Sequence, residues 1–187
     1  DNIPVYTGDG TSGIYIWGAQ LEEGSVATPY IKTTSTISGA PRFDHDPVTG
    51  ESKGLLIEEE RTNLVTYSEN FDAGFWTKQD VSLSQTASAP DGTNSATIVT
   101  RNSTSYGTVF IIRYSQSVTD GQSYTWSVFV KAGTYNGGIT ISLDSSISGG
   151  YPLGGSKSLT VNLSTGERIS GVTSGYTITS YQDGWYR

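Results

Sequence analysis

The residues of this chain that could bind a metal ion lie in one short loop. Asp44, Asp46 and Glu51 stand within the sequence DHDPVTGE, residues 44–51. Carboxylate oxygens on a glycine-containing loop suit Ca2+, which takes about six to eight oxygen ligands at about 2.3–2.6 Å. The same pattern is typical of a turn in which Asp side chains accept backbone hydrogen bonds and Pro47 sets the bend. The sequence leaves a Ca2+ site and a plain turn both open, and it indicates no other cofactor.

No set of residues forms a convincing catalytic pattern. His45 is the only histidine, and no G-x-S-x-G sequence precedes a helix, so a Ser/His/Asp relay is not expected. Two carboxylates about 5–9 Å apart could hydrolyse a glycosidic bond, but acidic runs at strand ends are usually solvated. We predict that the chain is not an enzyme, although carboxylates are available at Glu58, Glu59, Glu60, Glu69 and Asp72.

Aromatic side chains in or near loops could bind a sugar. The apolar face of a sugar ring stacks on Trp or Tyr, while its hydroxyl groups pair with polar side chains. Aromatic residues also close the ends of thin β-sandwiches, so a structural role is the competing interpretation. Trp126 and Trp185 lie in alternating strand patterns and are predicted to be core residues. The predicted glycan-binding residues are Trp76, Tyr106, Tyr114, Tyr135 and Tyr151.

The elements that must position these residues are predicted to be β-strands. Charged residues make up 16% of the 187 residues, against roughly 25% in ordinary domains. Residues 122–131 (QSYTWSVFVK) alternate with a period of two, so Tyr124, Trp126, Val128 and Val130 are expected on one face. Short strands separated by glycine-rich turns are typical of a β-sandwich or jelly roll. Further strands are expected over residues 94–100, 107–113, 138–144 and 158–163.

The charge of the chain limits its partners. The net charge is −7, and Lys and Arg do not cluster, so nucleic acid is not an expected partner because phosphate contacts need local positive charge. No run approaches about 20 apolar residues, so membrane insertion is not expected. The chain has no cysteine and therefore no disulfide framework. We interpret the acidity as a source of solubility.

The first clear strand is apolar on both faces. Residues 14–17 (IYIW) alternate Ile with Tyr and Trp, which is typical of a central or clamped strand. Gly18 follows and would allow a bulge or close packing. We predict that this segment is an assembly strand. Its predicted assembly residues are Ile14, Tyr15, Ile16, Trp17 and Leu21.

Several phrases of the sequence resemble known modules. Residues 63–71 (NLVTYSENF) with Trp76, and residues 120–133 (DGQSYTWSVFVKAG), resemble carbohydrate-binding modules of the family 4/9 type. Those modules are galactose-binding-like β-jelly rolls, and the resemblance implies a fold of that kind without catalytic residues. Modules of bacteriophage tail and other virion surface proteins are similar to residues 14–24 (IYIWGAQLEEG), 54–64 (GLLIEEERTNL), 162–166 (NLSTG) and 183–187 (DGWYR).

The order of these phrases sets the predicted domains. In the resembling proteins the IYIWGAQLEEG strand follows the GWYR strand, whereas here it comes first. Residues 1–31 are therefore expected to be the closing strand of a preceding or neighbouring module, residues 32–54 a linker and turn-rich loop, and residues 55–187 a jelly roll that is incomplete at its C-terminus. Three arrangements stay open: a fragment of a tandem protein, a strand that completes its own module, or one that completes a neighbouring subunit.

The resemblance implies a non-catalytic structural and adhesive module of a phage virion, associated with a tail or fibre. Its location would be the virion surface or the extracellular space. Its expected partners are other copies of itself, other virion proteins and host surface glycans. The alternatives are a carbohydrate-binding module of a secreted bacterial enzyme, which would be monomeric, and an extracellular filament subunit joined by exchanged strands.

Overall fold

The regular structure in the described part of the chain is nearly all β, in antiparallel sheets. The computed structural model describes residues 13–33, 43–46, 49–55, 62–102, 111–114, 118–119, 121–135, 137–143 and 157–187. Within these residues there is one short 3-10 turn, η1 (Gln182–Gly184), and no α-helix. The predicted all-β fold is confirmed. The described part holds no helix with the length and apolar character needed to cross a membrane.

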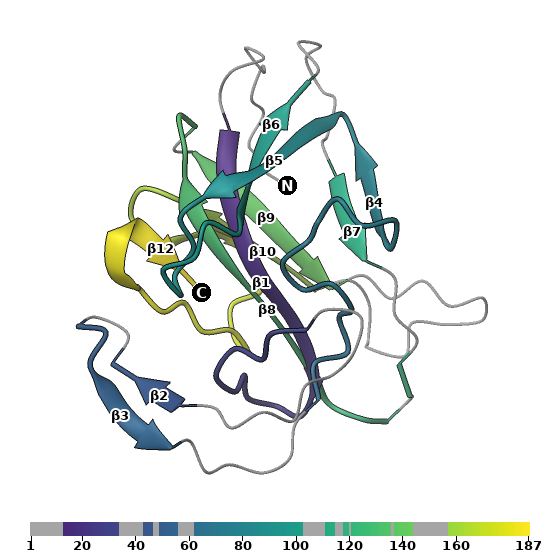
Figure 1. The fold of residues 1–187 in the computed structure, drawn as a ribbon. Helices are drawn as coiled ribbons and strands as arrows, with labels where there is room; N and C mark the ends of the chain where they lie inside the picture. Colours follow the sequence, from purple (N-terminus) through teal and green to yellow (C-terminus); the bar gives the residue numbers. More distant parts are fainter. Residues whose placement is uncertain are drawn as a thin grey trace.

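The first strand of the chain lies at the centre of the larger sheet. This sheet has five strands in the order β12-β8-β1-β6-β5, and each is antiparallel to its neighbours (Figure 1). In that order the strands span Trp185–Tyr186, Tyr124–Ala132, Gly13–Glu23, Ala96–Arg101 and Val81–Ala87. β1, the described part of the predicted closing strand with residues 24–31 after it, pairs with β6 and β8 of its own chain.

Three smaller groups of strands accompany this sheet. A three-stranded sheet has the order β11-β10-β9, and the described residues also form two pairs of strands, β4 with β7 and β2 with β3. In Figure 1 the β2–β3 hairpin lies apart from the sheets. The strands span Phe43–His45 (β2), Ser52–Leu55 (β3), Trp76–Gln79 (β4), Ile111–Tyr114 (β7), Gly138–Leu143 (β9), Lys157–Asn162 (β10) and Arg168–Gly171 (β11).

The main core covers one face of the larger sheet. Val128 and Val130 of β8 are buried there, and Tyr124 and Trp126 pack against the same cluster. Phe129 lies on the opposite face, in a second buried cluster. The alternation predicted for residues 122–131 is therefore confirmed. The main core also receives side chains from β1, β6 and β9 and from the end of β10, at Ile14, Ile16, Val99, Ile139, Ile141 and Leu163.

The two apolar faces of β1 are both buried, each in a different cluster. Ile14 and Ile16 enter the main core, while Trp17 enters the second cluster with Phe129. The pairing with β8 shifts register between Trp17 and Gln20, which is the bulge expected at Gly18. Gly18 has a φ of +59°, and a Cβ there would lie 3.1 Å from the ring of Tyr30. Only glycine meets both conditions without strain.

The structure corrects the prediction for residues 32–54. The expected linker and turn-rich loop contains the β2–β3 hairpin, in which Phe43 lies opposite Leu55. At its start, Thr33 is buried and hydrogen-bonded to residues that lie far along the chain. β4 and β5, over residues 76–87, were not predicted as strands either. Residues 34–42 and 56–61 lie outside the described residues, as does most of the predicted 107–113 strand.

Candidate functional site

Trp76, a predicted sugar-binding residue, lies in the core. Its side chain is 4% exposed, and its ring packs on Phe71 with the ring centroids 4.7 Å apart. The indole Nε1–H donates to the carbonyl oxygen of Tyr67 at 3.2 Å. A sugar needs an exposed ring face for stacking. Trp76 offers none in this structure and acts as a structural residue.

The other predicted glycan-binding residues are not brought together by the structure. Tyr135 is half-buried against the main core, and its hydroxyl donates to the carbonyl of Gly138 at 3.4 Å. Tyr114 lies in β7, but its side chain is outside the described part. Tyr106 and Tyr151 are also outside it.

An aromatic pair that the sequence did not indicate lies beside Trp76, with one ring exposed and the other half-buried. Phe75 is 58% exposed, and its ring stacks on Tyr67 with the centroids 5.1 Å apart and the planes 25° from parallel. Tyr67 has a φ of 58°, a conformation that is uncommon for a bulky residue. Such residues persist only where their surroundings fix them, and they cluster at ligand-binding sites. Here the hydrogen bond from Trp76 fixes the Tyr67 carbonyl.

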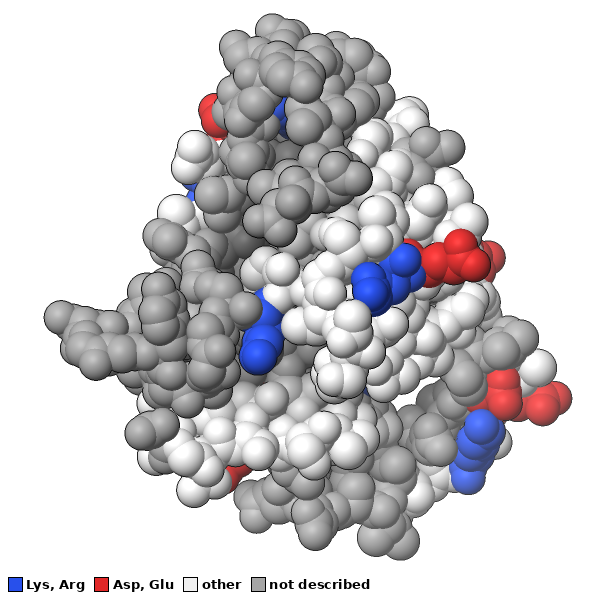
Figure 2. Space-filling view, turned by 180° about the vertical axis from the view of Figure 1, so that it is seen from behind, with Lys and Arg blue, Asp and Glu red and all other residues white. Residues whose placement is uncertain are grey.

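Hydrogen-bonding groups lie in the same loop as this aromatic pair. The Asp72 side chain is 83% exposed, and its Oδ1 is 3.0 Å from the Lys78 ammonium. Lys78 also donates to the Asp72 carbonyl, and the Asn70 side chain accepts from the Asp72 N–H. On the face shown in Figure 2, the described charges are few and mixed in sign. This part of the surface therefore combines one exposed ring, that of Phe75, with polar groups that can form hydrogen bonds.

A buried polar cluster, which we call the clasp, holds residues 24–33 against β1. It consists of the side chains of Gln20, Glu22, Asn63, Ser68 and Glu69. Glu22 is 0% exposed, and its carboxylate accepts from the N–H and the hydroxyl of Thr28 at 2.5 and 2.6 Å. The side-chain oxygen of Gln20, Oε1, accepts from the N–H of Ile31 at 2.6 Å. The side chains of Glu22 and Gln20 therefore accept hydrogen bonds from backbone N–H groups in the segment that follows β1.

Asn63 joins the clasp to the strand itself. Its amide group donates to the carbonyls of Ala19 and Ile31 at 3.2 and 3.0 Å. Its side-chain oxygen accepts from the N–H groups of Leu21 and Val65 at 3.2 and 3.0 Å. Four backbone groups in three segments depend on this one buried side chain.

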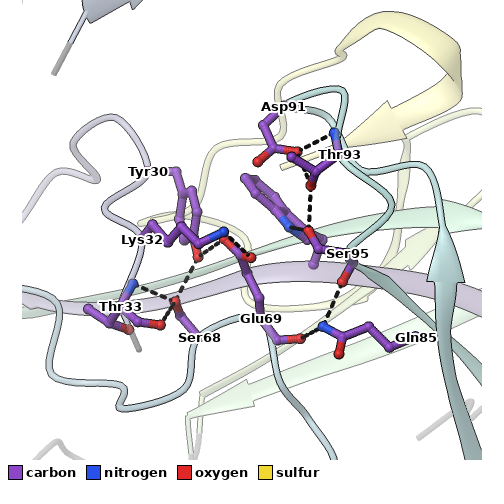
Figure 3. Close-up of polar contacts among 10 residues, drawn as sticks. Tyr30, Lys32, Thr33, Ser68, Glu69, Gln85, Asp91, Thr93 and Ser95 are labelled. Carbon is purple, nitrogen blue, oxygen red and sulfur yellow. Dashed lines mark hydrogen bonds and ion pairs between the residues drawn. The ribbon is translucent and has the colours of Figure 1, made fainter. Parts of the chain in front are cut away.

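Tyr30 and Glu69 close the other end of the clasp (Figure 3). The Tyr30 hydroxyl is 2.7 Å from Ser68 Oγ and donates to Glu69 at 3.1 Å, while the Lys32 ammonium lies 2.7 Å from the other Glu69 oxygen. Burial raises the pKa of the Tyr30 hydroxyl above its usual value, and the negative charge of Glu69 raises it further. Ser68 also exchanges two hydrogen bonds with the Thr33 backbone.

The clasp is connected to the β5–β6 hairpin. The Gln85 amide donates to the carbonyls of Glu69 and Ser95, at 3.2 and 3.0 Å. The Trp17 Nε1–H donates to Ser95 Oγ at 2.9 Å. Figure 3 shows the two contacts of Gln85, which connect β5 to Glu69 and Ser95 in loops. The polar groups drawn in Figure 3 form hydrogen bonds between segments that are far apart in the sequence, so they stabilise the fold.

The predicted Ca2+ residues lie in the β2–β3 hairpin, where Asp46 makes the hydrogen bonds of a turn. Asp46 Oδ1 accepts from the Thr49 N–H at 3.0 Å, and Oδ2 is 3.2 Å from the Lys53 ammonium. The Glu51 carbonyl accepts from the Asp46 N–H. Among the described residues no three His, Cys, Asp or Glu side chains are grouped to hold a metal ion. The side chains of Asp44 and His45 lie outside this description.

Comparison with family models, curated proteins and solved structures finds no match to this chain. Its function is therefore inferred from the clasp, the aromatic pair and the resemblance of its sequence phrases.

Proposed function

We propose that this chain is a non-catalytic structural and adhesive module of a phage virion, associated with a tail or fibre, that contacts host surface glycans. The clasp is the observation that carries the proposal. Its residues come from the two phrases IYIWGAQLEEG and NLVTYSENF, and their hydrogen bonds go mainly to backbone groups of the chain. Such a cluster makes a rigid support for surface loops, and it has no acid–base pair facing a cleft.

The aromatic pair Tyr67–Phe75 supports the adhesive part of the proposal. The exposed Phe75 ring can stack on the C–H face of a pyranose, and Asp72 and Lys78 can bind its hydroxyl groups. The net charge of −7 repels polyanions. A neutral glycan is therefore the ligand that this surface fits.

A carbohydrate-binding module of a secreted bacterial enzyme is the second candidate, because the aromatic pair would serve it equally well. Oligomeric state separates the two, since a free sugar-binding module works as a monomer and a virion module is assembled. The strand-exchanging filament receives less support. Its assembly strand would lie in another chain, whereas β1 pairs with β6 and β8 of its own chain.

The proposal is tested by binding to intact Gram-negative and Gram-positive bacteria and to two neutral polysaccharides, xylan and glucomannan. Binding should be lost after the cells are treated with periodate, which cleaves sugar diols. Phe75→Ala should weaken binding about tenfold, because an aromatic stacking contact contributes about 0.5–1.5 kcal/mol. The matched control is Tyr176→Ala, which removes another exposed aromatic ring.

Two results would contradict the proposal. Binding that survives periodate treatment would mean that the receptor is not a glycan. Binding that survives Phe75→Ala would mean that another surface of this chain binds the cells. Release of reducing sugar ends from either polysaccharide would show that the chain is an enzyme.

A further inference from the structure

β5 presents a strand edge that nothing in the described part of the chain covers. Among the described residues it is the last strand of the larger sheet and pairs only with β6. Its sequence, VSLSQTA, has no charged residue, proline or glycine. Natural edge strands usually carry Lys, Pro or a bulge that blocks pairing with another chain. A regular edge without a charge or proline can accept a further strand.

The other sheet edges differ from β5. β12, at the opposite edge of the same sheet, has two residues. β9, at an edge of the smaller sheet, continues into residues 144–156, which lie outside the described residues. The chain on both sides of β5 is described, over residues 62–80 and 88–102.

The side chains of β5 alternate in a way that suits a neighbouring strand. Val81 and Leu83 are half-buried and pack against the main core, whereas Ser82 and Ser84 are exposed on the other face. A strand added here would extend the core over the two apolar side chains. The register with β6 shifts between Gln85 and Ala87, so the regular part of the edge is residues 81–85.

We propose that a second copy of this chain pairs through the same edge, antiparallel across a two-fold axis centred at Leu83. This register places Ser82 of one copy opposite Ser84 of the other, where hydroxyl groups can exchange hydrogen bonds. It places Asp80 opposite Thr86, so no carboxylates face each other in a chain whose net charge is −7. An uncharged edge of this kind is complementary to itself, as a two-fold contact requires.

The contact extends the assembling role proposed above and rests on it, but it does not involve the aromatic pair. Residues 81–85 lie in β5, whereas Phe75 precedes β4. Failure of glycan binding and failure of the edge contact are therefore separate results.

Cysteine cross-linking tests the register, because the chain has no native cysteine. Ser82→Cys and Ser84→Cys are purified separately, mixed and oxidised gently. Opposite residues of an antiparallel pair lie within disulfide distance. A covalent dimer with one copy of each variant should form faster than either variant dimerises alone. Ser174→Cys, in an exposed turn, gives the background rate. A mixture that cross-links no faster than this background overturns the proposal.

A charge placed on the edge tests the contact without cross-linking. Light scattering after size-exclusion chromatography should show a dimer of the natural chain. Ser84→Lys should give a monomer with an unchanged circular dichroism spectrum, while Ser174→Lys should remain a dimer. A monomeric natural chain at the highest attainable concentration overturns the proposal. A dimer that Ser84→Lys leaves intact also overturns it, and places assembly on another surface.

Discussion

Residues 13–33 and the β2–β3 hairpin follow one another in the sequence, yet the fold holds them in different ways. The first segment lies between β6 and β8 and is fixed by the clasp. The hairpin leaves Phe43 59% and Leu55 57% exposed, and the ion pair between Asp46 and Lys53 is partly solvated. An isolated two-stranded hairpin is marginally stable in water. Strand content alone therefore does not indicate which parts of this chain are stable.

The difference between the two regions has a physical cause. Removing a partner from a buried hydrogen bond leaves a desolvated group that costs about 1–3 kcal/mol. An exposed ion pair contributes about 0–1 kcal/mol, because water and salt screen it. In a chain whose apolar content is 34%, satisfied buried polar groups supply much of the specificity that a larger core would provide.

The largest expected effect comes from deleting residues 13–33. β6 and β8 would lose their shared neighbour, and the main core would lose Ile14 and Ile16. We expect no cooperative thermal transition by circular dichroism. The matched control replaces residues 43–55 with a flexible linker and should keep the transition. If both variants kept the thermal transition, or both lost it, the two regions would not differ in their contribution to stability.

Asn63→Ala should have the next largest effect. It removes the donors and acceptor that serve four backbone groups. We expect the free energy of unfolding to fall by about 3 kcal/mol, within the range for buried polar networks. Urea unfolding measures this change. The control is Asn94→Ala, an exposed asparagine, which should change stability by about 0.5 kcal/mol or less.

The third prediction concerns alkaline pH. The folded-state pKa of Tyr30 is raised, so its hydroxyl ionises more readily in the unfolded chain. The stability it contributes is fully present below the ordinary tyrosine pKa of about 10 and is lost as the pH rises toward the folded value. Stability should therefore fall by up to about 1.4 kcal/mol per pH unit above that pKa. Tyr30→Phe should flatten this slope in urea unfolding measured between pH 9 and pH 11, values chosen as about one unit on either side of that pKa. An unchanged slope would contradict the assignment.

The smallest effect is expected in the hairpin. Replacing both Phe43 and Leu55 with Ser removes apolar side chains that are already exposed, so stability should change by about 0.5 kcal/mol or less. Leu163→Ala, in the main core, should cost about 3 kcal/mol. A large loss in the hairpin variant, measured by the same urea unfolding, would mean that these side chains are covered in solution.

The alternation of apolar and polar residues in the sequence predicted strands that have one face in the core. Residues 122–131 became β8 with the expected faces, and residues 138–144 and 158–163 became β9 and β10. β3, β4 and β5 were missed because they are short and mostly polar, with sequences SKGL, WTKQ and VSLSQTA. Asp80, with a φ of 54°, separates β4 from β5 in a way that reads as a turn. Local propensity is weak where one edge or face meets water.

The partners of β1 could not be read from the sequence, because its neighbours come from residues 96–101 and 124–132. The burial of Gln20 and Glu22, both 0% exposed, was not predicted either. Trp76 was predicted to bind a sugar but is buried, whereas its neighbour Phe75 is exposed, since adjacent residues in an extended segment point to opposite sides. Residue type alone does not show which of two neighbouring aromatic side chains reaches water.

The central place of β1 has a consequence for how the protein is made. A ribosome adds about 5–20 residues per second, so about 5–20 s separate the synthesis of β1 from that of β8. During this interval one of the most apolar strands of the molecule is outside the ribosome without its neighbours. Folding must wait for distant pairing, which is slow. The nascent chain is then exposed to aggregation, and a chaperone that binds residues 13–23 would raise the yield of folded protein.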